Sequence, residues 1–115
     1  MNPDVAEAID RTMRRDKPYM LPDITLDHLA DELAIPAKDL SMIINRHFGI
    51  NFYEFINRYR IDEAKKILGS AEEQTKSITD IYLQVGFNSK SVFNTFFKKL
   101  VGVTPSQYRK SSTES

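Results

Sequence analysis

Two stripes of side chains carry most of the chemistry that this sequence offers. Each stripe is spaced at i, i+3, i+4 and i+7, so in a helix its members share one face. Asparagine can pair with an adenine edge through two hydrogen bonds, serine and lysine can hydrogen-bond base edges, and methionine or a threonine methyl can touch a thymine methyl group. The stripes consist of Lys38, Ser41, Met42 and Asn45, and of Ser91, Asn94, Thr95 and Lys98.

Basic side chains supply a second kind of chemistry, the binding of phosphate. The chain has 16 basic and 16 acidic residues, yet residues 36–115 hold twelve basic and eight acidic ones. Residues 90–110 contain no acid, which creates a local positive field; such a run serves either solubility or phosphate contact. Because these basic residues lie near the two stripes of candidate base contacts, we favour phosphate contact. The candidates are Arg46, Lys98, Lys99, Arg109 and Lys110.

Three residues keep more than one interpretation. Lys38 and Lys90 each stand near the start of a predicted helix, where base contact and phosphate contact are both open. Met42 fits a thymine methyl, a protein partner or no partner. The base-contact candidates are therefore Lys38, Ser41, Met42, Asn45, Lys90, Ser91, Asn94 and Thr95.

Helices must position these residues, because apolar residues recur at helical spacing and no alternating stretch indicates a strand. We expect an all-α fold of about seven helices, with N-caps at Thr25, Asn51 and Ser77 and a left-handed helix end at Gly86. The helices are predicted over 3–16, 26–33, 36–48, 51–68, 78–85, 90–101 and from 104 onward, with loops at 17–23 and 70–76.

The predicted helix over 90–101 has an aromatic stripe. That spacing is more typical of a core than of a surface that stacks on single-stranded bases. We therefore expect its buried face to consist of Phe93, Phe96, Phe97 and Leu100.

The chain contains an internal repeat. A shift of 52 residues places the apolar positions of 26–35 on those of 78–87, and a shift of 53 places those of 40–55 on 93–108. Two copies separated by a long helix are too few for a solenoid. A helix, a tight turn and a second helix form a helix-turn-helix unit, whose second helix fits the major groove of DNA.

Other classes of chemistry have weak support. The sequence has no cysteine, and His28 and His47 lack metal-ligand spacing, so we expect neither a metal nor another cofactor. No run of about 18 apolar residues exists to span a bilayer, which leads us to expect a cytoplasmic chain. We expect no enzyme, because the carboxylates lack a defined pairing; they are Glu54, Asp62, Glu63 and Asp80.

The sequence resembles the AraC/XylS family of bacterial transcription regulators in its C-terminal DNA-binding domain. ITDIYLQVGFNSKSVFNTFFKKLVGVTPSQYRK follows the family signature of helix, Val-Gly-Phe turn, recognition helix and closing Gly-Val-Thr-Pro-Ser-x-Tyr-Arg. INFYEFINRYRIDEAKKIL is similar to the family's linker helix, and LADELAIPAKDLSMIINRHFG to its first unit. The family often has arginine where this chain has Met42 and Thr95, so two of the usual guanine-reading side chains are absent.

The resemblance implies two helix-turn-helix subdomains, over 1–50 and 70–115, joined by a linker helix over 51–69. It implies sequence-specific binding of double-stranded DNA in two successive major-groove segments, without catalysis or a cofactor. RNA polymerase is a further candidate partner. The resemblance also implies an excised part of a longer regulator, sometimes membrane-anchored, with a sensory or dimerising domain outside this chain.

A protein-interaction module is the alternative function. The net charge of zero and the missing arginines fit an adaptor that has lost DNA binding. Such an adaptor would lack the steep salt dependence that phosphate contacts give to DNA binding.

Overall fold

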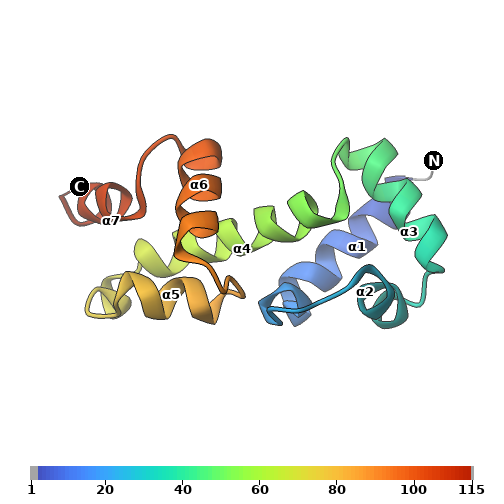
Figure 1. The fold of residues 1–115 in the computed structure, drawn as a ribbon, viewed down its shortest axis with the longest axis horizontal. Coiled ribbons are helices and arrows are strands. Elements are labelled where there is room, and N and C mark those ends of the chain that lie inside the picture. The colour runs from blue at the N-terminus through green and yellow to red at the C-terminus, as the bar shows by residue number, and fades with distance from the viewer. Residues whose placement is uncertain (1–2, 115) are drawn as a thin grey trace. The chain divides into compact units, whose positions relative to one another are not determined.

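A computed structural model describes residues 3–114, which form seven α-helices and no strand (Figure 1). The prediction of an all-α fold with about seven helices is confirmed. The helices are α1 (Pro3–Asp16), α2 (Leu26–Leu33), α3 (Ala37–Ile43), α4 (Phe52–Leu68), α5 (Ile78–Gln84), α6 (Lys90–Val101) and α7 (Pro105–Glu114). Three short helical segments accompany them: η1 (Pro18–Met20), η2 (Ile44–Phe48) and η3 (Ala71–Glu73).

The chain divides into two compact units, unit 1 (Met1–Tyr59) and unit 2 (Arg60–Ser115). The boundary lies inside α4, in the segment that the sequence assigns to a separate linker helix. Each half of α4 contributes to the core of its own unit, as Phe55 and Tyr59 do in unit 1 and Ala64 and Leu68 in unit 2. This helix is therefore a structural part of both units.

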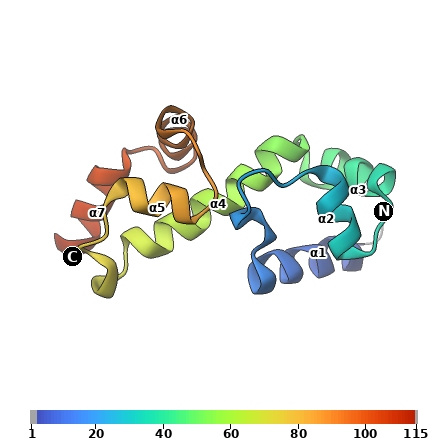
Figure 2. The same ribbon diagram turned by 60° about the horizontal axis from the view of Figure 1, so that its bottom comes forward.

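Unit 1 has one apolar core built from α1, α2, α3 and the first half of α4 (Figure 2). The same core includes Tyr19 from η1, whose ring stacks on that of Tyr59 at a centroid distance of 5.8 Å. The hydroxyl of Tyr59 donates a hydrogen bond of 2.5 Å to Asp10 of α1. Segment 17–23, which the sequence indicates to be a connector, thus supplies a core residue.

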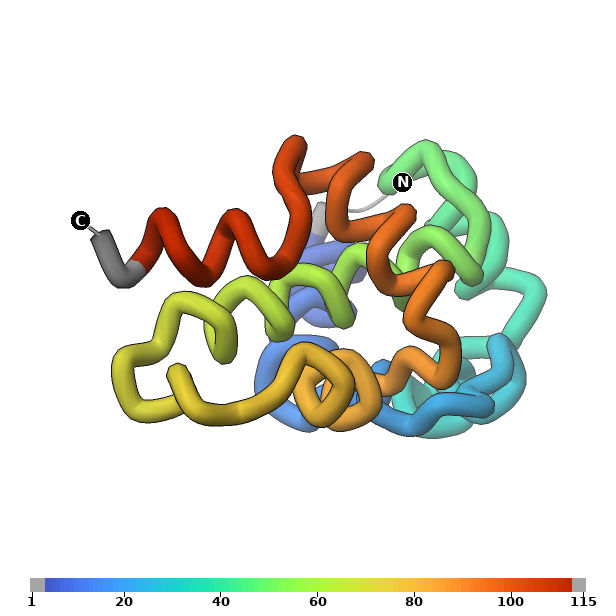
Figure 3. Tube along the Cα trace, turned by 60° about the vertical axis from the view of Figure 1, so that its left-hand side comes forward, coloured from blue at the N-terminus to red at the C-terminus, as the bar shows by residue number. Residues whose placement is uncertain are grey.

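Unit 2 packs α5, α6 and α7 against the second half of α4, and Figure 3 follows the trace through these helices. Phe93 and Phe97 of α6 are fully buried in its core. The prediction that Leu100 is buried is wrong, because 37% of this residue is exposed. The core-facing row continues instead from Phe97 to Val101, four residues and about one turn further on.

Polar side chains cap the helices where the sequence predicts caps. The side-chain oxygens of Thr25, Asn51 and Ser77 each accept a hydrogen bond from the backbone N–H three residues later, at 3.1, 2.8 and 3.0 Å. Ser89 does the same at the start of α6, at 3.2 Å. These bonds satisfy amide groups that have no partner within the helix, and so fix where each helix begins.

The turns of the two repeats have the same backbone hydrogen bonds. The N–H of Ile35 donates to Ala30 at 3.0 Å, and that of Phe87 donates to Tyr82 at 2.9 Å. The residue before each donor has positive φ, 55° at Ala34 and 112° at Gly86. The predicted left-handed helix end at Gly86 is confirmed, while the first copy makes its turn with alanine.

One predicted helix is divided into two parts. The segment 36–48 forms α3 and then a π-helical turn, η2, which ends at Gly49 with φ 74°. A π turn holds more residues than an α turn and recurs at functional sites. Of the helices in residues 3–114, none combines the length and apolar composition that crossing a membrane requires.

Exchanging glycine and alanine at the two turns should have different effects on stability. We expect Gly86→Ala to lower the free energy of unfolding by about 1–2 kcal/mol, because a side chain is strained at positive φ. Ala34→Gly should change stability little or raise it by up to ~1 kcal/mol, because relief of strain opposes the added freedom of the unfolded chain. Urea unfolding of both variants checks this, and equal losses would contradict it.

Candidate nucleic-acid interface

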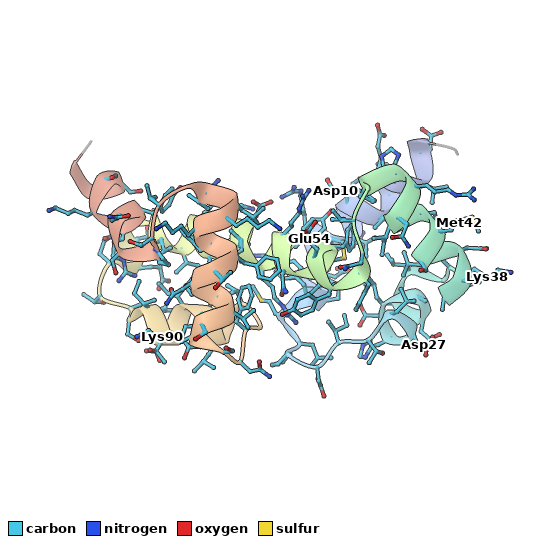
Figure 4. The ribbon with its side chains drawn as sticks, turned by 45° about the horizontal axis from the view of Figure 1, so that its top comes forward. Asp10, Asp27, Lys38, Met42, Glu54 and Lys90 are labelled. Atoms are coloured by element: carbon cyan, nitrogen blue, oxygen red, sulfur yellow. The ribbon has the colours of Figure 1, made fainter. Side chains whose placement is uncertain are left out.

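The first stripe lies on the side of α3 that faces away from the unit 1 core. Leu40 and Ile44 are fully buried, while Lys38 is exposed and Met42 is 38% exposed. Figure 4 shows Lys38 and Met42 on α3. Ser41 is half-buried at the flank. Three members of the predicted stripe, Lys38, Ser41 and Met42, therefore lie on α3, and Lys38 and Met42 are accessible.

The last member of this stripe, Asn45, lies in the π-helical turn and not in α3. Its side chain is exposed, and Nδ2 donates a hydrogen bond of 3.0 Å to the backbone carbonyl of Ser41. One amide hydrogen is therefore already engaged. Oδ1 and the second amide hydrogen remain for an external partner.

The second stripe lies on α6, opposite the buried Phe93 and Phe97. Ser91 and Thr95 are exposed and Asn94 is half-buried. The structure gives Asn94 no intramolecular side-chain hydrogen bond to residues 3–114, in contrast to Asn45. Its amide is thus the less constrained of the two candidate adenine-reading groups.

Several of the predicted cations are accessible. Lys38, Arg46, Lys90 and Lys98 are exposed and have no ion pair with any described residue. Lys90 is the first residue of α6 (Figure 4). Lys99 and Lys110 are also exposed, and the Lys99 amine lies 5.9 Å from the centroid of the Phe96 ring.

Arg109 differs from these cations, because it has a partner within its own unit. It is half-buried on α7, and Nη2 donates to the Glu73 carbonyl oxygen at 3.4 Å. Its Nε is buried without a hydrogen-bond partner among the described residues. The side chain therefore connects α7 to η3, and its contact with a phosphate stays a prediction.

The charges of the two units have opposite sign. Unit 1 contains seven basic and ten acidic residues, a net charge of −3, and unit 2 contains nine and six, a net charge of +3. Residues 81–113 of unit 2 carry no acid. A polyanion is therefore attracted mainly to unit 2.

One charged residue on α3 was missed by sequence reasoning. Asp39 is exposed, and with Met42 and Arg46 it has the spacing i, i+3 and i+7 that places side chains on one flank. A shallow surface groove is lined by Asp39, Met42, Ile43, Arg46 and His47. The same spacing rule that gave the predicted stripe could have identified this second row.

Several other carboxylates lie beside a basic side chain. Glu54 pairs with Arg58 at 3.4 Å, and Glu32 lies 3.1 Å from His28. A hydrogen bond from Arg15 lowers the pKa of Asp16 on the exposed surface of α1. Nowhere in residues 3–114 do three potential metal ligands gather into a metal-binding group.

Comparisons with known proteins place these features in context. A family model described as a helix-turn-helix domain matches residues 29–111. The chain is 37% identical over 87 residues to an uncharacterized HTH-type transcriptional regulator of Staphylococcus aureus (strain COL), covering 76% of this chain and 11% of that protein. It is 33% identical over 91 residues to the melibiose operon regulatory protein of Escherichia coli (strain K12), covering 79% and 29%.

A solved structure shares the fold of most of this chain. The C-terminal domain of AraT, a response regulator from Geobacillus stearothermophilus, matches with a TM-score of 0.72 and 31% identity, covering 96% of this chain and 86% of that one. The chain thus spans most of that solved domain but less than a third of the two regulators.

Substitution of Arg109 should lower stability more than substitution of Lys98, because Arg109 is half-buried and Lys98 is exposed. We expect Arg109→Gln to lower the free energy of unfolding by about 1 kcal/mol, because a backbone hydrogen bond and packing of the half-buried side chain are lost. Lys98→Gln should change it by less than about 0.5 kcal/mol. Urea unfolding followed by circular dichroism measures both. Equal stability of the two variants would show that Arg109 contributes no more to the fold than an exposed cation does.

Proposed function

The chain belongs to the AraC/XylS family of transcriptional regulators, as a DNA-binding domain with two helix-turn-helix units, and from this premise we propose how it binds. It binds double-stranded DNA and regulates transcription without catalysis. Each unit places its second helix, α3 or α6, in one of two successive major-groove segments.

One observation supports this proposal: in both units, the second helix of the helix-turn-helix has one buried row of side chains and an exposed row on the opposite side. In unit 1, Leu40 of α3 and Ile44, the first residue of η2, are buried. In unit 2, Phe93 and Phe97 of α6 are buried. An α-helix fits the major groove, and polar side chains on its outer face can then reach base edges. We assign Lys38, Ser41, Met42 and Asn45 to one segment, and Lys90, Ser91, Asn94 and Thr95 to the other.

The phosphate contacts are unequal between the units. Unit 1 offers Arg46, and unit 2 offers Lys98, Lys99 and Lys110 within a region free of acids. Counterion release by cations on phosphates provides much of the affinity for DNA. Unit 2 therefore supplies the larger share of the sequence-independent affinity, and unit 1 depends more on its base contacts.

Footprinting tests the two-segment proposal directly. After selection of a binding site from a random pool, we expect one chain to protect about two turns of duplex, since equivalent major-groove positions recur about every 34 Å. Protection of a single half-turn would contradict the proposal and leave one unit with another role.

The salt dependence of the same complex separates DNA binding from the adaptor function. Affinity should fall steeply with salt, and Lys98→Gln should flatten the slope of log K against log salt by about one, without changing the preferred sequence. Duplex binding that is absent at low salt would support the adaptor instead.

The two asparagines are expected to differ in their effect on base choice. Asn94→Ala should relax one position of the selected site, at a cost of about 1–3 kcal/mol, because a bidentate amide contact is lost. Asn45→Ala should have the smaller effect, because Nδ2 already bonds the Ser41 carbonyl. Selected-site profiles of the wild type and both variants measure this.

Lys98→Gln is the control for this comparison. It should lower affinity for all sequences alike, as expected for a phosphate contact. If both asparagine variants behave as Lys98→Gln does, with unchanged profiles, the proposed amide contacts to bases are wrong.

A further inference from the structure

We propose that Asp39 selects a cytosine in the DNA segment that α3 contacts. This inference rests on the proposed function, because it assumes that α3 enters a major groove. It adds an acidic side chain to a surface for which the sequence predicts only cationic, neutral polar and apolar contacts.

The position of Asp39 allows such a contact. It lies in the first turn of α3. The N-terminal residues of a recognition helix are the ones that usually contact base edges. Its side chain is exposed, and the structure gives it no hydrogen bond or ion pair with any described residue. The carboxylate is therefore available to an external hydrogen-bond donor.

The chemistry of a carboxylate restricts that donor. An ionised carboxylate only accepts hydrogen bonds, and DNA phosphates repel it. The major groove offers two kinds of donor, the N4 amino group of cytosine and the N6 amino group of adenine. Adenine also presents its N7 acceptor beside N6, which a carboxylate cannot satisfy, so cytosine is the better match.

The neighbours of Asp39 favour a base contact near the groove floor. Met42 and Ile43 line the shallow surface groove that Asp39 also lines, and they provide apolar contact for the carbon edge of a pyrimidine. Arg46 stands on the same flank and has no intramolecular ion pair among residues 3–114. It can hold a phosphate and so offset the repulsion between Asp39 and the DNA backbone.

A purely structural role for Asp39 is the competing explanation. An acid in the first turn stabilises a helix through the helix dipole, without any role in recognition. Asp27 has the same type of position in the first turn of α2, is exposed, and provides the matched control (Figure 4). Replacing either acid by asparagine removes one negative charge and keeps the shape of the side chain.

The experiment compares selected-site profiles of the full chain, Asp39→Asn and Asp27→Asn. Asparagine pairs with adenine through N6 and N7, so we expect Asp39→Asn to change one selected position from cytosine to adenine, by about tenfold in relative affinity. Asp27→Asn should leave the profile as in the wild type. Asp39→Ala should lose the cytosine preference without gaining adenine.

Two results would overturn the inference while leaving the proposed function in place. One is a profile that is the same for the wild type and Asp39→Asn. The other is an equal rise in affinity for every sequence in Asp39→Asn and Asp27→Asn, which would show simple charge repulsion. A wild-type chain that binds no duplex would overturn the proposed function as well. Circular dichroism at the assay temperature establishes that each variant is folded.

Discussion

The burial of one row of the second helix is the constraint on which each unit depends. Leu40 and Ile44 in unit 1, and Phe93 and Phe97 in unit 2, are fully buried. Since side chains four residues apart share a helix face, fixing this row also fixes which side chains are presented outward. The turn before each of these helices serves the same end, and in unit 2 the Ser89 side chain also caps the start of α6.

This shared framework presents two different surfaces. On α3 the accessible row combines Lys38 and Met42, and Asp39 lies on its flank, whereas residues 81–113, which include α6, contain no acid. In the function we propose, the unit with the net negative charge gains least from nonspecific attraction to DNA, so its binding depends most on the fit of its side chains. The repeat therefore explains a common architecture, and the charges explain a division of roles.

The sequence predicts the helices well because their signals are local. Apolar spacing, N-caps such as Thr25 and the glycine at position 86 act within a few residues. Two burial states were not predicted. Tyr19 is buried against Tyr59, which is distant in the sequence, and Leu100 is exposed because the core-facing row runs from Phe97 to Val101. For the interface, spacing found both stripes, but the half-buried state of Arg109 and the π turn at Asn45 required three-dimensional information.

The π-helical turn of η2 limits how far the two proposed recognition helices are interchangeable. Alignment at an offset of 53 pairs Asn45 with Lys98 and Arg46 with Lys99. Asn45 and Arg46 lie in a π turn, whereas Lys98 and Lys99 lie in a regular α-helix. A residue in the wider turn projects in a different direction from its counterpart. Rules for base contact that are established for one unit therefore apply to the other only over residues 37–43, the part of the first unit that is a regular α-helix.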